Sequence, residues 1–315
     1  MATTICRRIL LAVDGSDQAL EAVRYAGTIF PSERTKIVLF TVGTGFPEVF
    51  WDLGRNPLYQ SQKSKVMGWL ADRQLTIGEF RAKAYKILAD ADFSENTVEI
   101  KTQTKKTNIL NDIVQESYQE YNAVVVGRTG ISRSKDLVVG SLAGKIVKII
   151  KHIPTIIVGG RPTSRRILIA LDESIEAMRG VNSVGVLAGS RNPEVTLCHM
   201  IKLPGRFHLP GSRPESAEKG QQWLEYSKNK FKPYMDEATG RLIEAGVEAE
   251  RISPDFLVVR GSPVRKVLET ARNGNYGTIV VGRRQALSFV EEHIWGRFSE
   301  KTIKMAENMA VWTIS

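Results

Sequence analysis

The 315-residue chain is longer than one hydrophobic core usually supports, so we expect two domains, residues 1–160 and 161–315. Its net charge of +10 is spread evenly, at +5 for each half, which argues against a nucleic-acid-binding face and favours a solvated surface that attracts anions. The sequence has neither a signal-peptide pattern nor an apolar run near the roughly 18 residues of a membrane span, so we expect a cytoplasmic protein that does not enter the membrane.

In residues 1–160, short apolar runs alternate with segments of helical periodicity. The runs "ILLAV" and "AVVVG" are apolar throughout or nearly so, as strands covered on both faces of a sheet require. Strands that alternate with helices predict a parallel, doubly wound α/β sheet. The predicted strands are Ile5–Asp14, Thr35–Val42, Thr97–Thr104, Ala123–Gly127 and Thr155–Val158, and the predicted helices are Ser16–Phe30, Gln62–Ala91, Asn108–Tyr121 and Ser141–Lys151.

The second half repeats the first after a short linker, Gly159–Arg165, that is rich in turn-forming residues. The segment "RRILLAVDGSDQALEAVRYAG" from Arg7 aligns with "RRILIALDESIEAMRGVNSVG" from Arg165, and "YNAVVVGRTG" from Tyr121 aligns with "YGTIVVGRRQ" from Tyr276. The agreement in order and spacing indicates a tandem duplication. We therefore predict two tandem, doubly wound, five-stranded parallel sheets related by a pseudo-two-fold axis. The strands of the second are Ile167–Asp172, Val195–Met200, Ala249–Val259, Thr278–Gly282 and Val311–Ile314.

Two long connections lie outside this regular pattern. Residues 43–60 contain four aromatic side chains, and their second-half counterpart, residues 201–216, is rich in proline and glycine. Loops of this length are uncommon unless they cover something or move. The aromatic side chains either pack on the helices of their own domain or form a lid or a partner contact, and the sequence leaves both alternatives open. They are Phe46, Phe50, Trp51 and Tyr59.

A glycine-rich stretch follows the predicted strand Ala123–Gly127, with glycines at 127, 130 and 140 and a serine at 141. In open α/β sheets, ligands bind beyond the carboxyl ends of the strands, where the strand order reverses. Ser141 is placed to begin a helix, whose free N–H groups and positive dipole end attract an anion. Glycines also allow main-chain N–H groups to approach phosphate oxygens, and Arg128, Arg133 and Lys135 add positive charge. The stretch predicts either a phosphate site or an ordinary tight turn.

The spacing of these residues resembles the ATP-binding signature of the universal stress protein family: glycine, two residues, glycine, nine residues, then Gly-Ser. Gly127, Gly130, Gly140 and Ser141 fill every place in it. The strand endings "LAVDGS" and "LFTV" also resemble those of the family, and the likeness covers the chain twice, as in tandem-domain members. The resemblance implies a Rossmann-like, adenine nucleotide alpha hydrolase-like fold and ATP binding by the first half.

The resemblance also implies a role for each residue of the site. Asp14 would lie beside the nucleotide, near any Mg²⁺ that ATP carries, and Val42 would lie against the adenine. The glycine loop, Ser141 and the N–H groups after it would hold the phosphates. A second interpretation of Asp14 stays open, because an aspartate between a strand and "GS" is often only a turn or helix cap. The full expected set is Val13, Asp14, Val42, Val126, Gly127, Arg128, Gly130, Gly140, Ser141, Leu142 and Ala143.

The equivalent stretch of the second half departs from the signature. Gly282 and Gly296 remain, but a glutamine and an arginine replace the middle glycine and the serine, ten residues intervene instead of nine, and two glutamates add negative charge. We predict that the second half binds ATP poorly or not at all and acts as the pseudo-dimer partner of the first. Asp172 and His199 keep the frame of the site, and for His199 a structural role at the end of a strand is favoured over a ligand role. The changed residues are Gln285, Glu291, Glu292 and Arg297.

The first half departs from the family pattern in one place, where Lys105 and Lys106 replace a common glycine after the third strand; we expect them to be solvated.

Walker, nucleophile-elbow, His-Glu-x-x-His and Cys-x-x-Cys motifs are absent from the sequence, so at most slow ATP hydrolysis is expected. Cys6 and Cys198 are expected to be buried free thiols in a reducing compartment.

Two classes of function remain. The first is a stress-response or signalling protein that binds ATP and a protein partner of unknown identity. The alternative is an ATP-independent protein that binds a partner or small ligand through residues 43–60 or a pocket in the second half. An adenylate-handling enzyme is a third, weaker alternative, and further homodimerisation is left open.

Overall fold

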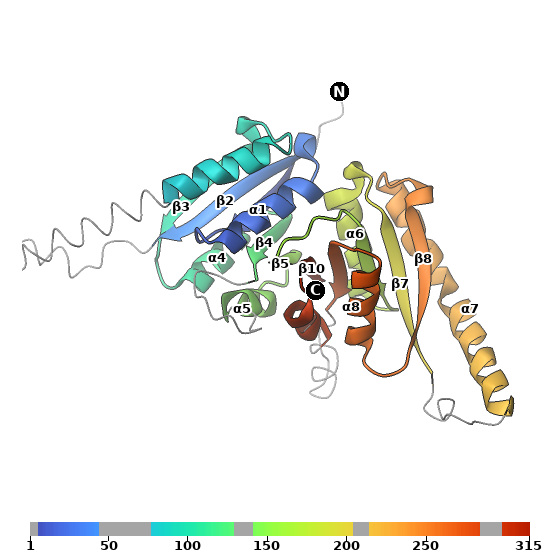
Figure 1. Cartoon of the computed structure of the whole chain (residues 1–315). Coiled ribbons are helices and arrows are strands. Elements are labelled where there is room, and N and C mark those ends of the chain that lie inside the picture. Colours follow the sequence, from blue (N-terminus) through green and yellow to red (C-terminus); the bar gives the residue numbers. More distant parts are fainter. Residues whose placement is uncertain (1–5, 44–76, 129–140, 204–213, 284–297) are drawn as a thin grey trace, which may run out of the picture.

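The computed structural model describes residues 6–43, 77–128, 141–203, 214–283 and 298–315, and within them it forms one sheet of ten strands (Figure 1). The strand order is β3-β2-β1-β4-β5-β10-β9-β6-β7-β8, so each half contributes five consecutive positions. The first-half strands are β1 (Arg7–Ala12), β2 (Thr35–Gly43), β3 (Val98–Thr104), β4 (Ala123–Gly127) and β5 (Thr155–Gly159), and the second-half strands are β6 (Ile167–Leu171), β7 (Val195–Lys202), β8 (Ile252–Val259), β9 (Thr278–Gly282) and β10 (Met309–Ile314).

The two halves join through their last strands. β5 and β10 pair antiparallel, with Ile157 opposite Val311, whereas every other pairing of strands in the described residues is parallel. The predicted α/β class and the two doubly wound five-stranded repeats are therefore confirmed. The repeats are not two separate sheets but one continuous sheet, and the carboxyl terminus lies at its middle because β10 is a central strand (Figure 1).

Helices cover both faces of the sheet. One face carries α1 (Asp17–Ile29), the helical residues 77–89, α6 (Ile175–Ala188) and α7 (Pro214–Glu244). The other carries α4 (Ile109–Ser117), α5 (Ser141–Ile149), α8 (Pro263–Asn273) and the helical residues 298–305. Of the predicted helix Gln62–Ala91, the part before residue 77 lies outside the described residues. None of the described helices is both long and apolar enough to cross a membrane.

The apolar strands are buried on both faces, as their composition predicts. Successive residues of β1 alternate between the two cores: Ile9 and Leu11 pack under α1, and Leu10 packs under α5. All three are fully buried. The predicted bounds of β4 and β9 match those observed, and the other strands differ by a few residues at their ends.

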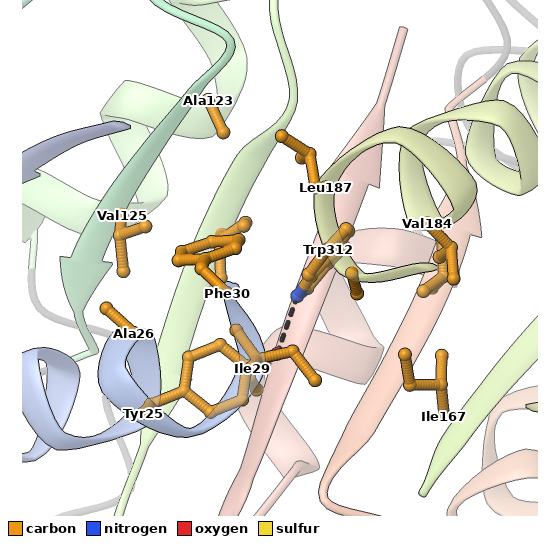
Figure 2. Packing of buried hydrophobic residues seen from close by; sticks show 14 of the residues in the cluster. Tyr25, Ala26, Ile29, Phe30, Ala123, Val125, Ile167, Val184, Leu187 and Trp312 are labelled. Atoms are coloured by element: carbon orange, nitrogen blue, oxygen red, sulfur yellow. Dashed lines mark hydrogen bonds between the residues drawn. The ribbon is translucent and has the colours of Figure 1, made fainter. Parts of the chain in front are cut away.

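A buried hydrogen-bond network crosses from the first half to the second. Tyr25, on α1, reaches over the junction, and its hydroxyl lies 2.7 Å from Thr278 Oγ1 of β9. The same hydroxyl accepts a hydrogen bond of 2.7 Å from Trp312 Nε1, and Phe30 packs beside Trp312 with ring centroids 6.2 Å apart (Figure 2). Burial raises the pKa of Tyr25 far above its ordinary range, so the hydroxyl stays protonated. The two halves thus share one core.

Other contacts confirm the repeat in three dimensions. Arg8 lies 4.8 Å from the ring centroid of Tyr121, and the equivalent Arg166 lies 4.6 Å from that of Tyr276. The same cation–π pair therefore fixes the start of the first strand in each half. Cys6 and Cys198 are free thiols, as expected, and Cys198 is buried. Cys6 is exposed, so the prediction of burial is wrong for it, because it lies just before β1 and not within the strand.

Candidate functional site

The order of strands reverses between β1 and β4, so the carboxyl ends of these two strands border the crevice where a ligand would bind. β2 lies on the other side of β1, with Ala12 opposite Phe40. α5 begins at the same edge, because it follows β4 in the chain and leads back to the start of β5. The topology therefore brings Asp14, Val42, Gly127 and the start of α5 to one edge of the sheet.

Asp14 forms the turn that leads from β1 into α1. Its Oδ1 accepts a hydrogen bond of 3.0 Å from Ser16 N, and Ser16 Oγ in turn caps α1 by accepting one of 3.1 Å from Ala19 N. Gly15, between them, has a φ of +86°, which favours glycine. The Asp14 side chain is exposed at the edge of the sheet. The turn interpretation is therefore confirmed.

Apolar side chains flank the crevice on the α5 side. Ala12, Val42 and Leu142 are partly exposed and pack on the core that lies under α4 and α5. Val13, by contrast, is buried, and its N–H continues the β1–β2 ladder with a bond of 2.9 Å to Phe40 O. Val126 and Ala143 are also buried, so their side chains support the site from below.

Gly127 has a steric explanation of its own. A Cβ at this position would lie 3.1 Å from Gln18 O, because the first turn of α1 passes close over the end of β4. At Gly282, its second-half equivalent, a Cβ would lie 2.6 Å from Ala177 N of α6. Helix packing therefore disfavours a larger residue at both positions, more strongly at Gly282 than at Gly127, even though the glycine signature of the second half is degenerate.

The side chain of Arg128 points away from the crevice. Its main-chain N–H donates to Val158 O at 2.8 Å, and its guanidinium donates to Ala306 O in the second half. Burial lowers the pKa of Arg128 from its ordinary value, although nearby Glu307 opposes the shift. Arg283, the second-half equivalent, donates to Val147 O of α5. The two equivalent arginines therefore each reach across the junction, Arg128 into the second half and Arg283 into the first.

Gln18 is a residue of the site that the sequence pattern does not reveal. Its side-chain amide donates to Val158 O at 3.1 Å and to Gly160 O at 3.0 Å, so the first turn of α1 is tied to the end of β5 and to the linker. Because the repeat has a glutamate at the equivalent position, 176, the sequence alignment gives no signal for this role.

Several predicted residues lie outside the described part of the chain or are only partly described. They include residues 129–140, with Gly130, Arg133, Lys135 and Gly140, and the aromatic residues at 46, 50, 51 and 59. So are the changed second-half residues, Gln285, Glu291, Glu292, Gly296 and Arg297. Ser141 is the first residue of α5, and the described chain resumes there.

Lys105 and Lys106 are exposed, as expected of solvated residues. Their main-chain N–H groups donate to Gly43 O at 2.7 Å and to Asp112 Oδ2 at 2.9 Å, respectively. Asp112 is buried and so anchors this turn, after which Asn108 caps α4.

The second half keeps the framework of the site but fills it differently. Asp172 Oδ1 accepts a bond of 3.0 Å from Ser174 N, which repeats the Asp14 turn. His199 Nδ1 donates to Leu171 O at 2.9 Å, and its ring stacks on Phe231 with centroids 3.5 Å apart and meets Phe256 edge-on. Burial lowers the pKa of His199. These contacts are those of a packed residue, and because β7 continues to Lys202, His199 lies within the strand and not at its end. No cluster of three or more side chains suited to bind a metal occurs among the described residues of the chain.

Comparisons with known proteins agree with this architecture. The model of the universal stress protein family matches residues 6–158 and again residues 163–311. A universal stress protein from Archaeoglobus fulgidus is similar over 100% of this chain and 99% of that chain, with a TM-score of 0.61 and 17% identity. A functionally unknown protein from Pseudomonas aeruginosa is similar over 99% of this chain and 94% of that chain, with a TM-score of 0.55 and 15% identity.

A universal stress protein in complex with cAMP is similar over 48% of this chain and 96% of that chain, at 19% identity and a TM-score of 0.36. A search of curated protein sequences found no match. At these identities the solved structures support the fold alone. Because the family model matches both halves, and both halves fold as the same five-stranded unit, the chain belongs to the universal stress protein family and carries two of its domains in tandem.

Proposed function

We propose that this chain is an ATP-binding stress-response or signalling protein whose first half binds the nucleotide at the crevice between β1 and β4. The observation that supports this most is the meeting of Asp14, Val42, Gly127 and the start of α5 at one edge, in a half whose sequence fills the whole signature. The family often binds nucleotides. In this proposal the second half is the intramolecular partner and holds no ATP.

The described residues fit an adenine nucleotide. Ala12, Val42 and Leu142 offer apolar surface to the faces of the base, and the exposed carboxylate of Asp14 accepts hydrogen bonds such as those of ribose hydroxyls. The first N–H groups of α5, including those of Leu142 and Ala143, suit a phosphate because a helix leaves them without internal partners. Asp14 is also the residue we propose for any Mg²⁺ carried by the nucleotide. Arg128 joins the site through its main chain, since its guanidinium donates to Ala306 O.

Nucleotide that co-purifies with the protein tests this proposal. Purified protein is denatured by heat, and the supernatant is chromatographed for ATP. We expect ATP in the wild type, a reduced amount in Gly130→Val and Ser141→Ala, and no change in the matched second-half variant Gln285→Gly. A supernatant without nucleotide, together with a Tm that added ATP does not raise, would favour the ATP-independent alternative.

The two aspartate turns provide a second matched pair. Asp14→Ala and Asp172→Ala remove the same hydrogen bond to a serine N–H, so each should lower stability by about 1 kcal/mol. Only Asp14→Ala should also weaken ATP binding, by roughly tenfold, because it removes a charged hydrogen-bond partner from the site. Isothermal titration calorimetry measures the difference. Equal ATP affinities in the two variants would remove Asp14 from the site.

A further inference from the structure

Two short helices lie side by side over the junction of β5 and β10, on the face of the sheet that also carries α4 and α8 (Figure 1). They are α5 and the helical residues 298–305, which precede β5 and β10, respectively. Lys148 of α5 and Glu300 of the second helix form an ion pair of 3.1 Å. The inner sides of both helices are buried against the sheet, so their outer sides face away from it together.

The outer sides of these helices carry two equivalent sets of residues, which we call the junction patch. Each set has two lysines and one apolar residue: Lys145, Lys148 and Ile149 on α5, and Lys301, Lys304 and Met305 on the second helix. The spacing places each set on one side of its helix. All six residues are exposed, Ile149 by 43% and Met305 by 38%. Exposed positions seldom decide stability, so stability alone does not explain why both repeats have this pattern.

The junction patch is positively charged. Within the part of the chain that the structure describes, Lys148 is the one lysine of the patch that forms an ion pair. Two glutamates lie nearby, and each already has a basic neighbour, since Glu300 pairs with Lys148 and Glu307 lies 4.0 Å from Arg272. Lys151, just after α5, is a fifth lysine, so five lysines and these two glutamates leave a net charge of +3. The region therefore attracts an anionic surface.

The exposed apolar pair, Ile149 and Met305, indicates which kind of anionic surface fits. Apolar side chains among lysines are typical of protein surfaces that lie on a lipid bilayer, where lysines meet the headgroups and apolar groups enter the acyl boundary. A bilayer is also alike in every direction along its surface, so it can contact both equivalent sets in the same way. The phosphate backbone of a nucleic acid would meet the lysines but would leave the apolar pair in water.

We propose that the junction patch is a docking surface for a membrane that contains anionic lipids. The four lysines of the patch meet the headgroups, and Ile149 and Met305 insert between them, without any helix crossing the bilayer. This inference is independent of the proposed ATP site, because it uses none of the same residues.

Co-sedimentation of the full chain with lipid vesicles tests the surface. The wild type should bind vesicles of equal parts phosphatidylglycerol and phosphatidylcholine at low salt, and should not bind phosphatidylcholine alone. Lys301→Gln combined with Lys304→Gln should weaken this binding by about 30-fold, because each lysine near an anionic surface adds to the affinity.

The matched control is Lys83→Gln combined with Lys86→Gln. These lysines are also exposed and three residues apart on one helix, but that helix packs on the opposite face of the sheet. The control makes the same change in net charge, so it should weaken vesicle binding by less than about threefold. An equal loss of binding in the two lysine pairs would overturn the proposal, because net charge and not the patch would then explain it.

Ile149→Gln combined with Met305→Gln tests the apolar contacts at constant net charge. Both positions are exposed, so the fold should be retained, and vesicle binding should weaken by about tenfold. A wild type that does not bind the anionic vesicles would overturn the proposal. So would an apolar variant that binds them as the wild type does, a result that would favour a soluble polyanion, such as a nucleic acid, as the partner of the lysines.

Discussion

A glycine at position 127 or 282 can be explained either by helix packing or by ligand binding. Each lies where the first turn of a helix crosses the end of a strand, and a Cβ would lie close to main-chain atoms in both halves, 3.1 Å from Gln18 O at position 127 and 2.6 Å from Ala177 N at position 282. The signature glycine at 127 therefore does not by itself indicate a ligand, since 282 is kept in a half without the full signature. The residues that distinguish the halves are Gly130 and Ser141, against Gln285 and Arg297.

His199 makes stability depend on pH. Burial disfavours its charged form and holds its folded pKa below the ordinary value of 6.5, although the bond to Leu171 O and the charges of Asp172 and Glu173 oppose the shift. The unfolded chain then binds the proton more readily, so this contribution to stability is present above pH 6.5 and is lost as pH falls from there through the folded pKa. Urea unfolding of the wild type and His199→Phe across this range measures it. A variant that loses as much stability as the wild type on acidification would contradict the prediction.

At the scale of elements, the junction of β5 and β10 holds the halves together through main-chain hydrogen bonds, the two crossing arginines and the Tyr25 network. An ion pair of 3.1 Å between Lys148 of α5 and Glu300 adds to it. The buried network should be costly to break, because its groups cannot turn to water if a partner is lost.

Tyr25→Phe tests this network. The change leaves Trp312 Nε1 without its acceptor and Thr278 Oγ1 without its partner, so the free energy of unfolding should fall by about 1–3 kcal/mol. Tyr118→Phe is the control, since that side chain is 61% exposed, and it should change stability by less than about 0.5 kcal/mol. Guanidinium unfolding measures both. Equal effects would show that the hydroxyl of Tyr25 contributes little.

Much of the fold follows from the sequence, because the repeated apolar runs fix where the strands begin and end. β4 and β9 match their predicted bounds for this reason. The pairing of β5 with β10 could not be predicted, since an apolar strand has the same composition whether its neighbour comes from its own half or the other. The role of Gln18 and the direction of the Arg128 side chain depend on contacts between distant segments, which local patterns do not encode.

For the whole molecule, a shared core predicts cooperative unfolding. The full chain should unfold in one transition whose calorimetric and van't Hoff enthalpies agree. Residues 1–160 expressed alone would expose the edge of β5 and the apolar surface that Trp312 covers, so we expect them to form a dimer or to aggregate. Light scattering after size-exclusion chromatography measures the mass. A stable monomer of this fragment, or two separate transitions in the full chain, would show that the halves are independent.

The antiparallel contact of β5 with β10 also has a consequence for how the protein behaves when it is scarce. Two separate subunits joined by such strands come apart when they are diluted, because their association depends on concentration. Here both strands belong to one polypeptide, so the effective concentration of each for the other is fixed by the covalent chain. The pair therefore stays assembled however few copies a cell contains.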